Sequence, residues 1–339
     1  MADNAYVAVT GATGFIGANI VKYLTRQGRN VLGIDLEVGD DELFDDYVED
    51  HRDQVELVEA DLRNEDRILG LAEDYEIDDV IHAAVFTVVA EEIEAEYSHD
   101  ILDTNLMGTV NMLELAKAAD ADRFVYVSSS GVYGSTDDID EPVTEDSIDP
   151  YLKDGNLYLI AKINSEKVVQ RYSELFDITG TSVRIAAPYG PMERPTGTRR
   201  RMGPIYRLLE MIVDEGKDNI RVKGLEYVRD WTYSMDTAKG IVAGLDAPEP
   251  SLYNVTYGVN YSLEEILNTA QSIGGLDFIW EVVEDESEAD FAANVSSLRG
   301  PLSNEKAFHE LDYDPEYDLE RGIETYYEWW THANEQFDW

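Results

Sequence analysis

The chain has 339 residues and a formal net charge of −45, from 71 acidic and 26 basic residues. Cysteine is absent, which excludes disulfides, thiolate metal sites and a cysteine nucleophile, and the negative field excludes nucleic acid and anionic membranes as partners. No apolar run is long enough to cross a bilayer and no basic–apolar leader opens the chain, so we expect a cytoplasmic protein.

Strand-like and helix-like segments alternate through the first half of the chain. Short apolar strand patterns occur at 5–9, 30–35, 55–60, 79–84, 123–128 and 181–186, and helical patterns at 15–27, 65–73, 98–119 and 158–176. Short apolar strands between helices are typical of a parallel sheet that is covered on both faces. The pattern therefore predicts an α/β fold with a Rossmann-type doubly wound parallel sheet.

A glycine-rich turn follows the first strand and opens the first helix. Its glycines are spaced to turn the chain tightly and to bring the backbone close to a diphosphate at the helix N-terminus. The residues expected to contact a dinucleotide there are Gly11, Gly14, Phe15, Ile16 and Gly17.

The second strand ends in Asp35, at the position where a carboxylate accepts hydrogen bonds from the adenosine ribose. That charge would repel a 2′-phosphate, and no Arg or Lys follows it within 36–40. The competing interpretation is an acid in an acid-rich loop, but the position at a strand end favours ribose binding. The sequence therefore predicts NAD as the cofactor in preference to NADP.

After residue 188 the regular alternation ends, and Pro and Gly residues interrupt a loop that carries Arg194 and the run 199–201. In a chain with so few bases, these guanidinium groups either recognise a carboxylate or phosphate, or pair with the acidic surface. Helical patterns follow at 204–215, 263–272 and 319–333.

These observations predict that the chain folds into two structural parts. We expect an NAD-binding domain over 1–188 and a smaller substrate-binding lobe over 189–339, which caps the carboxyl ends of the strands. A strand near 251–257 is expected to return to the main sheet and so to interleave the two units.

Tyr158 and Lys162 lie four residues apart at the start of a predicted helix, so their side chains share one face. An adjacent ammonium lowers the pKa of a phenol and makes it usable as an acid and base. The serines at 128–130 end the fifth predicted strand and offer a hydroxyl that could hold a substrate oxygen. Such a pair alone is usually surface decoration, and its place in the order of strands is what gives it weight.

Taken in order, the glycine turn, the acid after the second strand, the serines after the fifth and Tyr-xxx-Lys resemble the extended short-chain dehydrogenase/reductase family, of the NAD-dependent epimerase/dehydratase type. The resemblance implies an NAD-dependent enzyme with Ser129 as the catalytic hydroxyl, Ser130 being the fallback one residue away. It also implies that Tyr158 removes a hydroxyl proton and that Lys162 contacts the nicotinamide ribose. The further positions that the resemblance assigns are Asn105 in the proton relay, Asp61, Leu62, Ala83, Ala84 and Pro188 at the cofactor, and Arg229 at the substrate. We also expect Ser130, beside Ser129, and Arg194, from the loop after the sixth strand, to contact the substrate.

The resemblance leaves the substrate open. Many nucleotide-sugar members of the family carry an asparagine before the Pro-Tyr-Gly turn, where this chain has Ala187. We therefore expect an NAD-dependent dehydrogenase of a free sugar or sugar acid. The alternatives are a nucleotide-sugar 4-epimerase of the UDP-glucose/UDP-galactose type with tightly bound NAD, favoured by Arg229, and, from another class, a non-catalytic NAD-binding regulator. Ser130-Gly131 stands where dehydratases carry Asp-Glu, which disfavours a dehydratase.

The sequence also bears on the oligomeric state, the salt environment and metal binding. The resemblance implies a homodimer formed through the helices of Asn105 and Tyr158. The dispersed acidic charge resembles that of proteins from salt-loving archaea, where salt screens the repulsion. The histidines show no metal-ligand spacing, so we expect no metal and treat His82, His99 and His309 as structural.

Overall fold

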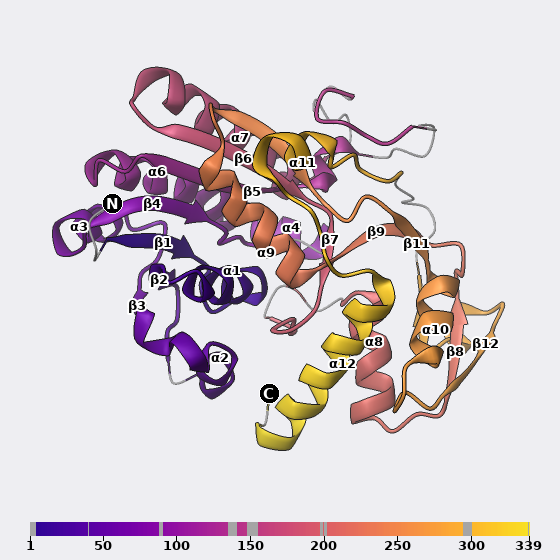
Figure 1. The fold of residues 1–339 in the computed structure, drawn as a ribbon. Coiled ribbons are helices and arrows are strands. Elements are labelled where there is room, and N and C mark those ends of the chain that lie inside the picture. The colour runs from indigo at the N-terminus through magenta and orange to yellow at the C-terminus, as the bar shows by residue number, and fades with distance from the viewer. Residues whose placement is uncertain are drawn as a thin grey trace.

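The computed structural model describes residues 5–39, 41–87, 91–134, 141–147, 155–196, 199, 202–293, 300–337 and 339. A seven-stranded sheet forms the centre of the molecule, in the order β10-β6-β5-β4-β1-β2-β3 (Figure 1). Every neighbouring pair runs parallel, which confirms the predicted Rossmann-type α/β fold. The strands are β1 (Tyr6–Thr10), β2 (Asn30–Asp35), β3 (Val55–Glu59), β4 (Ile77–His82), β5 (Arg123–Ser129), β6 (Thr179–Ile185) and β10 (Ser251–Val255).

Helices pack on both faces of this sheet and bury it. Successive side chains of a strand point to opposite faces, so each strand contributes to both layers of the core. In β1, Val7 and Val9 join a core cluster that contains residues of α1 (Phe15–Arg26) and α9 (Ser234–Ala243). Ala8, between them, joins a different cluster, which contains residues of α6 (Gly108–Ala118). The continuous apolar character of the strand follows from this two-sided burial.

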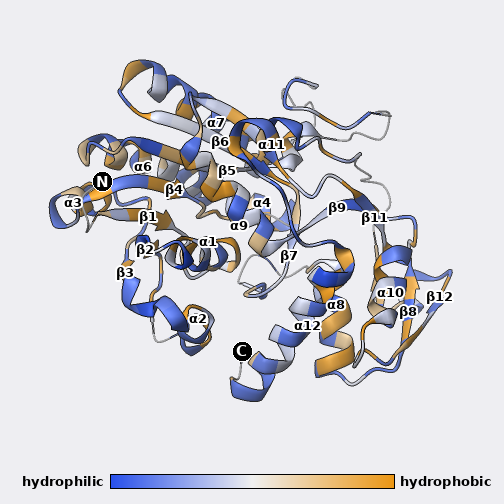
Figure 2. Cartoon of the chain, viewed as in Figure 1, coloured by the Kyte–Doolittle hydropathy of each residue, from blue (hydrophilic) through white to orange (hydrophobic). Residues whose placement is uncertain are grey.

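The second half of the chain builds a smaller lobe beside the carboxyl ends of the sheet strands (Figure 1). It contains two three-stranded sheets, in the orders β11-β9-β7 and β12-β8-β13. Figure 2 shows α8 as largely hydrophobic, and its buried residues share a core cluster with α10 and α12. The elements are β7 (Ala187–Tyr189), β8 (Asn219–Lys223), β9 (Val228–Tyr233), β11 (Asn260–Ser262), β12 (Ile279–Val282), β13 (Phe291–Ala292), α8 (Pro204–Leu209), α10 (Leu263–Ser272) and α12 (Leu319–Gln336).

The strand β10 comes from the second half of the sequence but pairs in parallel with β6, with Ser251 opposite Thr181. The helix expected at 98–119 is instead three pieces: α5 (Ser98–Leu102), a π-helical turn (η2, Asp103–Met107) and α6. The remaining helices are α2 (Glu42–Tyr47), α3 (Glu65–Asp74), α4 (Glu91–Glu96), α7 (Leu157–Leu175) and α11 (Glu305–Leu311), with short helical turns at Glu49–Gln54, Ser130–Tyr133, Glu210–Asp214, Gly244–Asp246 and Glu286–Glu288. None of the helices in the described part of the chain has the length and apolar content needed to span a bilayer.

Candidate active site

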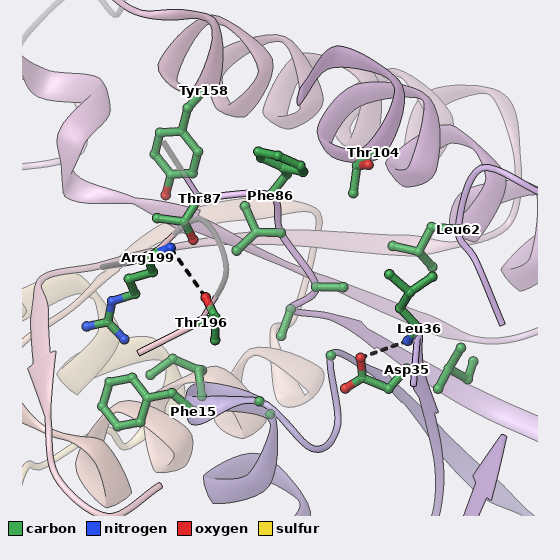
Figure 3. A pocket seen from close by; sticks show the side chains of 18 of the residues that line it. Phe15, Asp35, Leu36, Leu62, Phe86, Thr87, Thr104, Tyr158, Thr196 and Arg199 are labelled. Carbon is green, nitrogen blue, oxygen red and sulfur yellow. Dashed lines mark hydrogen bonds between the residues drawn. The ribbon is translucent and has the colours of Figure 1, made fainter. Parts of the chain in front are cut away.

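A cavity of about 630 Å³ opens at the carboxyl ends of the parallel strands. This is the edge at which ligands bind in open α/β sheets. Figure 3 shows Tyr158, Thr87 and Arg199 toward one end of the cavity and Asp35, Leu36 and Leu62 toward the other. The sequence-predicted residues on its wall are Gly11, Gly14, Phe15, Ile16, Gly17, Asp35, Asp61, Leu62, Ala83, Ala84, Ser129, Tyr158, Pro188 and Arg194.

The glycine turn forms a cradle that side chains would fill. Gly11 has a φ of 67°, and a Cβ there would come within 2.9 Å of the Ala84 backbone. A Cβ on Gly17 would overlap the carbonyl group of Gly11. Helix α1 begins directly after this turn, so its first N–H groups have no carbonyl partner within the helix. The residues present therefore fit the diphosphate of a dinucleotide, which needs close backbone approach and a helix N-terminus.

Asp35 is fixed at the rim of the cavity by local hydrogen bonds. Its Oδ2 accepts from the backbone N–H of Thr13 at 3.0 Å and from the Thr13 hydroxyl at 2.8 Å. Its Oδ1 accepts from the N–H of Leu36 at 2.8 Å. The carboxylate is therefore oriented before any ligand binds, and its charge opposes a 2′-phosphate at this end of the cavity.

Beside Asp35, the loop after β3 supplies a fixed ion pair that the sequence did not predict. Arg63 donates to both oxygens of Asp61, with the shortest contact at 2.8 Å, and to Asp100 at 2.7 Å. These hydrogen bonds hold the pKa of Asp61 below its usual range. Arg63 follows Asp61-Leu62 in an acid-rich stretch, and only the packing of α5 against this loop brings Asp100 to it.

The predicted acid–base pair lies on the first turns of α7. Asn156 caps this helix by accepting from the N–H of Leu159 at 3.0 Å. Tyr158 lines the cavity, whereas Lys162 is buried beneath it, with Nζ 5.8 Å from the centre of the Tyr158 ring. The Lys162 ammonium donates to the carbonyl oxygen of Val127 at 2.6 Å. Burial lowers the pKa of Lys162 to about 7, although the nearby Glu166 acts in the opposite direction.

The alternation of β5 separates the three serines. Ser128 is buried and donates to Glu166 at 2.6 Å, so its hydroxyl points away from the cavity. Ser129, the last residue of the strand, lines the cavity, and its Oγ accepts from the N–H of Gly131 at 3.1 Å. Ser130 is buried in the following helical turn and is not on the cavity wall. This placement favours Ser129 over Ser130 as the hydroxyl that reaches a ligand.

Asn105 lies in the π-helical turn and supports the wall of the cavity without lining it. Its Oδ1 accepts from the N–H of Phe86 at 2.7 Å, and its Nδ2 donates to the Phe86 carbonyl at 3.0 Å. Phe86 and Thr87 line the cavity. A π turn inside a helix often marks a functional position, and no local feature of the sequence predicted it.

A buried ion pair joins the helix that carries Tyr158 to the main sheet. Arg184 on β6 donates to both oxygens of Glu166 on α7, at 2.9 and 2.7 Å. The side chains are 3% and 9% exposed, so the pair is largely removed from water. Because Glu166 also accepts from Ser128, it joins α7 to the two sheet strands β5 and β6 beside Ser129.

His82 is buried at the end of β4, between Thr10 and Thr109. Burial lowers its pKa to about 3, so the ring is neutral at ordinary pH. Within the described residues, no group of three or more His, Asp or Glu side chains could hold a metal ion.

The arginines predicted at the substrate lie in different places. Arg194 lines the cavity at the glycine turn, where it contacts Asp41 and the carbonyl of Thr13. Arg199, which also lines the cavity, pairs with Glu193 at 2.5 Å. Burial raises the pKa of the Glu193 carboxyl to about 7, against the opposing effect of Arg199. Arg229 on β9 lies over the ring of Tyr227 at 4.6 Å and is not on the cavity wall. The remaining arginines of the run, at 200–201, lie outside the described residues.

The fold and the cavity together define a dinucleotide-binding protein of the extended short-chain dehydrogenase/reductase type. The chain belongs to the NAD dependent epimerase/dehydratase family, whose model matches residues 7–256. This confirms the family resemblance and the prediction of NAD as the cofactor. The protein is therefore an NAD-dependent enzyme of this family.

Individual relatives cover nearly the whole chain. A UDP-glucuronate 4-epimerase from Thermodesulfobacterium geofontis is 27% identical over 333 residues, which is 96% of this chain and 95% of that protein. The structure of a UDP-glucose 4-epimerase from Bifidobacterium longum, in complex with NAD+ and UDP, superposes with a TM-score of 0.81 at 22% identity, covering 98% of this chain and 100% of that one. A UDP-glucuronic acid 4-epimerase from Bacillus cereus, with UDP-glucuronic acid and NAD, gives a TM-score of 0.76 at 24% identity, covering 97% and 99%. These relatives agree better with the epimerase alternative than with the free-sugar dehydrogenase that the sequence favoured.

Proposed function

We propose that this protein is a nucleotide-sugar 4-epimerase that acts on UDP-glucuronate or UDP-glucose with NAD held in the cavity. One observation carries the proposal: Ser129 and Tyr158 line the same cavity as the glycine turn and Asp35. The similarity to UDP-glucuronate 4-epimerases over nearly the whole chain supports it.

The cofactor would be held at two points of the cavity. The N-terminus of α1, with Gly11 and Gly17, would bind the diphosphate, and Asp35 would accept hydrogen bonds from the adenosine ribose. When bound, NAD supplies reversible hydride transfer at a sugar carbon.

Tyr158 would move the proton that this chemistry requires. Its phenolic oxygen takes the proton of the sugar hydroxyl as a carbonyl forms, and returns it when the hydroxyl is restored on the opposite face. Ser129 would donate a hydrogen bond to the same sugar oxygen and so fix its position. The two side chains act from different elements, β5 and α7, on one oxygen.

Lys162 would tune Tyr158 from below the cavity floor. A positive charge one helical turn away stabilises the phenolate form of a tyrosine relative to the phenol. Burial favours the neutral amine of Lys162, and the nearby Glu166 carboxylate opposes this effect and favours the ammonium. The hydrogen bond to Val127 keeps the ammonium in place while Tyr158 gains and loses its proton.

A basic residue near Tyr158 supports an acidic sugar as substrate. Arg199 lies on the cavity wall in a chain with only 26 basic residues, and a guanidinium group suits a uronate carboxylate. Arg199 already pairs with Glu193, so part of its charge is balanced within the protein.

The free-sugar dehydrogenase remains the second candidate because Ala187 stands where many nucleotide-sugar enzymes carry an asparagine. Ala187 packs against the core cluster of the second lobe. An alanine there removes one polar contact to a substrate, and the many other contacts available to a nucleotide diphosphate can offset that loss.

The test compares the two activities in one preparation. The purified protein, in multimolar KCl, is given UDP-glucuronate or UDP-glucose without added NAD, and the sugars are separated by chromatography. A parallel set receives NAD with free aldoses or uronic acids, and NADH absorbance is followed. Interconversion of a UDP-sugar with its C4 epimer, without NADH accumulation, is expected. NADH accumulation with a free sugar and no change in the UDP-sugars would replace the proposal by the dehydrogenase. Binding of NAD without turnover of any sugar would support the third alternative, a non-catalytic NAD-binding regulator.

A further inference from the structure

A segment of the second half of the chain crosses onto the rim of the NAD cavity. We call residues 190–196 the strap. Its inner end is anchored on α1, where the Nδ2 of Asn19 donates to the carbonyl of Pro191 at 3.0 Å. Asn19 is completely buried, and its Oδ1 also accepts from Tyr47 at 2.7 Å and from Ser234 at 2.9 Å. The strap is therefore fixed at one end by a buried polar cluster.

The backbone of the strap turns sharply between this anchor and its outer end. Gly190 has a φ of 140° and Met192 a φ of 69°, an unusual value for a residue with a side chain. Met192 and Glu193 are buried, with exposed fractions of 0% and 2%. The turn thus directs two successive side chains inward, and the next residue, Arg194, reaches the rim of the cavity.

At the rim, Arg194 joins the strap to two distant segments. Its Nη2 donates to Oδ2 of Asp41 at 2.5 Å and to the carbonyl oxygen of Thr13 at 3.3 Å. Asp41 is itself fixed, because its Oδ1 caps α2 by accepting from the N–H of Phe44 at 3.0 Å. The two charged side chains are 30% and 24% exposed, so this is a half-buried bridge between the strap and the dinucleotide-binding half.

Thr13 connects this bridge to the cofactor site. It lies in the glycine turn, and its N–H and hydroxyl donate to Asp35 while its carbonyl accepts from Arg194. Arg194 and Asp35 therefore hold the turn from two sides. Among the described residues, the contacts of the guanidinium come from Nη2, which leaves the donors of Nη1 and Nε for a phosphate oxygen.

We propose that Arg194 and Asp41 form a clasp that closes the strap over the diphosphate of bound NAD and slows its release. Arg194 is then a cofactor-retaining residue, where the sequence suggested a substrate contact. The bridge also has to open for the dinucleotide to leave, because it spans the rim of the cavity beside the glycine turn. The inference depends on NAD binding alone and does not require the proposed epimerisation.

The experiment measures NAD release in the absence of sugar. Protein loaded with radiolabelled NAD is mixed with excess unlabelled NAD, and retained label is followed over time. We expect Arg194→Gln to accelerate release roughly three- to tenfold, because an interaction of this kind acts mainly on the dissociation rate. Asp41→Asn keeps an oxygen that can cap α2 and should accelerate release in the same direction.

Two comparisons make the result specific to the clasp. The double variant should release NAD no faster than the faster single variant, because both changes open one bridge. Arg207→Gln is the matched control, since Arg207 pairs with Glu210 on the far lobe and does not line the cavity, and it should release NAD as the wild type does. Circular dichroism establishes that each variant is folded.

Two outcomes would overturn the proposal. Unchanged NAD release in Arg194→Gln, with a raised KM for the sugar substrate, would assign the guanidinium to the substrate. Faster release in Arg194→Gln but not in Asp41→Asn would assign it to the phosphate without any clasp. The release rates are measured without sugar, so they test the clasp even if the protein fails the epimerase assay.

Discussion

The ammonium of Lys162 and the carbonyl oxygen of Val127 are 2.6 Å apart, which joins helix α7 to strand β5 directly beneath the cavity. The same two elements carry Tyr158 and Ser129 to the cavity wall. One hydrogen bond thus fixes the spacing between the elements that carry the proposed acid–base residue and the proposed hydrogen-bond donor. The buried Glu166–Arg184 pair fixes α7 against β6 in the same region.

Replacing Tyr158 by phenylalanine removes the phenolic oxygen and keeps the ring that lines the cavity. Loss of a positioned acid–base group typically lowers the rate by about 10²- to 10⁴-fold, and we expect a loss of that size in kcat. NAD binding, measured by calorimetry on the same preparation, should not change. Wild-type turnover in this variant would remove Tyr158 from the mechanism.

The lowered pKa of Lys162 predicts a pH dependence of stability. Its pKa is about 7 in the folded protein against 10.5 for an unperturbed lysine, so between these values the unfolded chain binds the additional proton. The contribution of Lys162 to the free energy of unfolding therefore increases as pH rises from 7 to 10.5, by at most about 1.4 kcal/mol per pH unit.

The group is isolated by comparison with Lys162→Met. In NAD-free protein, the free energy of unfolding of the wild type minus that of the variant should increase with pH over this window. All other titrating groups are common to both proteins and cancel in the difference. A flat difference would show that Lys162 titrates at the same pH in both states.

Gly17→Ala tests the cradle of the glycine turn. The added Cβ would overlap the carbonyl group of Gly11, so the turn or the helix must move. We expect NAD affinity to fall by at least roughly tenfold and the free energy of unfolding to fall by about 1–3 kcal/mol. Gly70→Ala is the control, because a Cβ at that position of α3 meets only open space. Equal behaviour of the two variants in calorimetry would contradict the close packing.

The Glu166–Arg184 pair predicts a non-additive stability effect. Arg184→Met leaves the Glu166 carboxylate buried without its guanidinium partner, which typically costs about 3–5 kcal/mol. The double change, with Glu166→Leu added, removes the stranded charge and should recover part of that loss. Denaturant unfolding of both variants measures the difference, and a double variant less stable than Arg184→Met would contradict this reasoning.

The sequence predicted the strands of the main sheet to within two residues, because apolar strands and the glycine turn are local signals. The π-helical turn at Asp103–Met107 was missed, since its apolar spacing remains close to that of an α-helix. The family resemblance indicated Ser129, with Ser130 as the fallback. The structure adds the physical reason, because the register of β5 turns the Ser128 hydroxyl to Glu166 and Ser129 to the cavity.

The contacts of the arginines could not be predicted from the sequence. Their scarcity identified them as candidates, but Arg194 meets Thr13 and Asp41 only through the packing of the two halves of the chain. Arg63 likewise becomes part of the cavity wall through Asp100 on a different element. Contacts between residues this far apart in the chain leave no periodic or local pattern in the sequence.

The most direct test of the proposed epimerisation follows one atom. UDP-glucuronate and UDP-glucose labelled with deuterium at C4 are each incubated with the protein, and the products are analysed by NMR. The proposed function predicts a C4 epimer that retains the deuterium at C4, with no reduced cofactor accumulating, because the deuterium taken up by the dinucleotide is returned to the same carbon. Deuterium that leaves the sugar and accumulates in the dinucleotide would show net oxidation and contradict the epimerase.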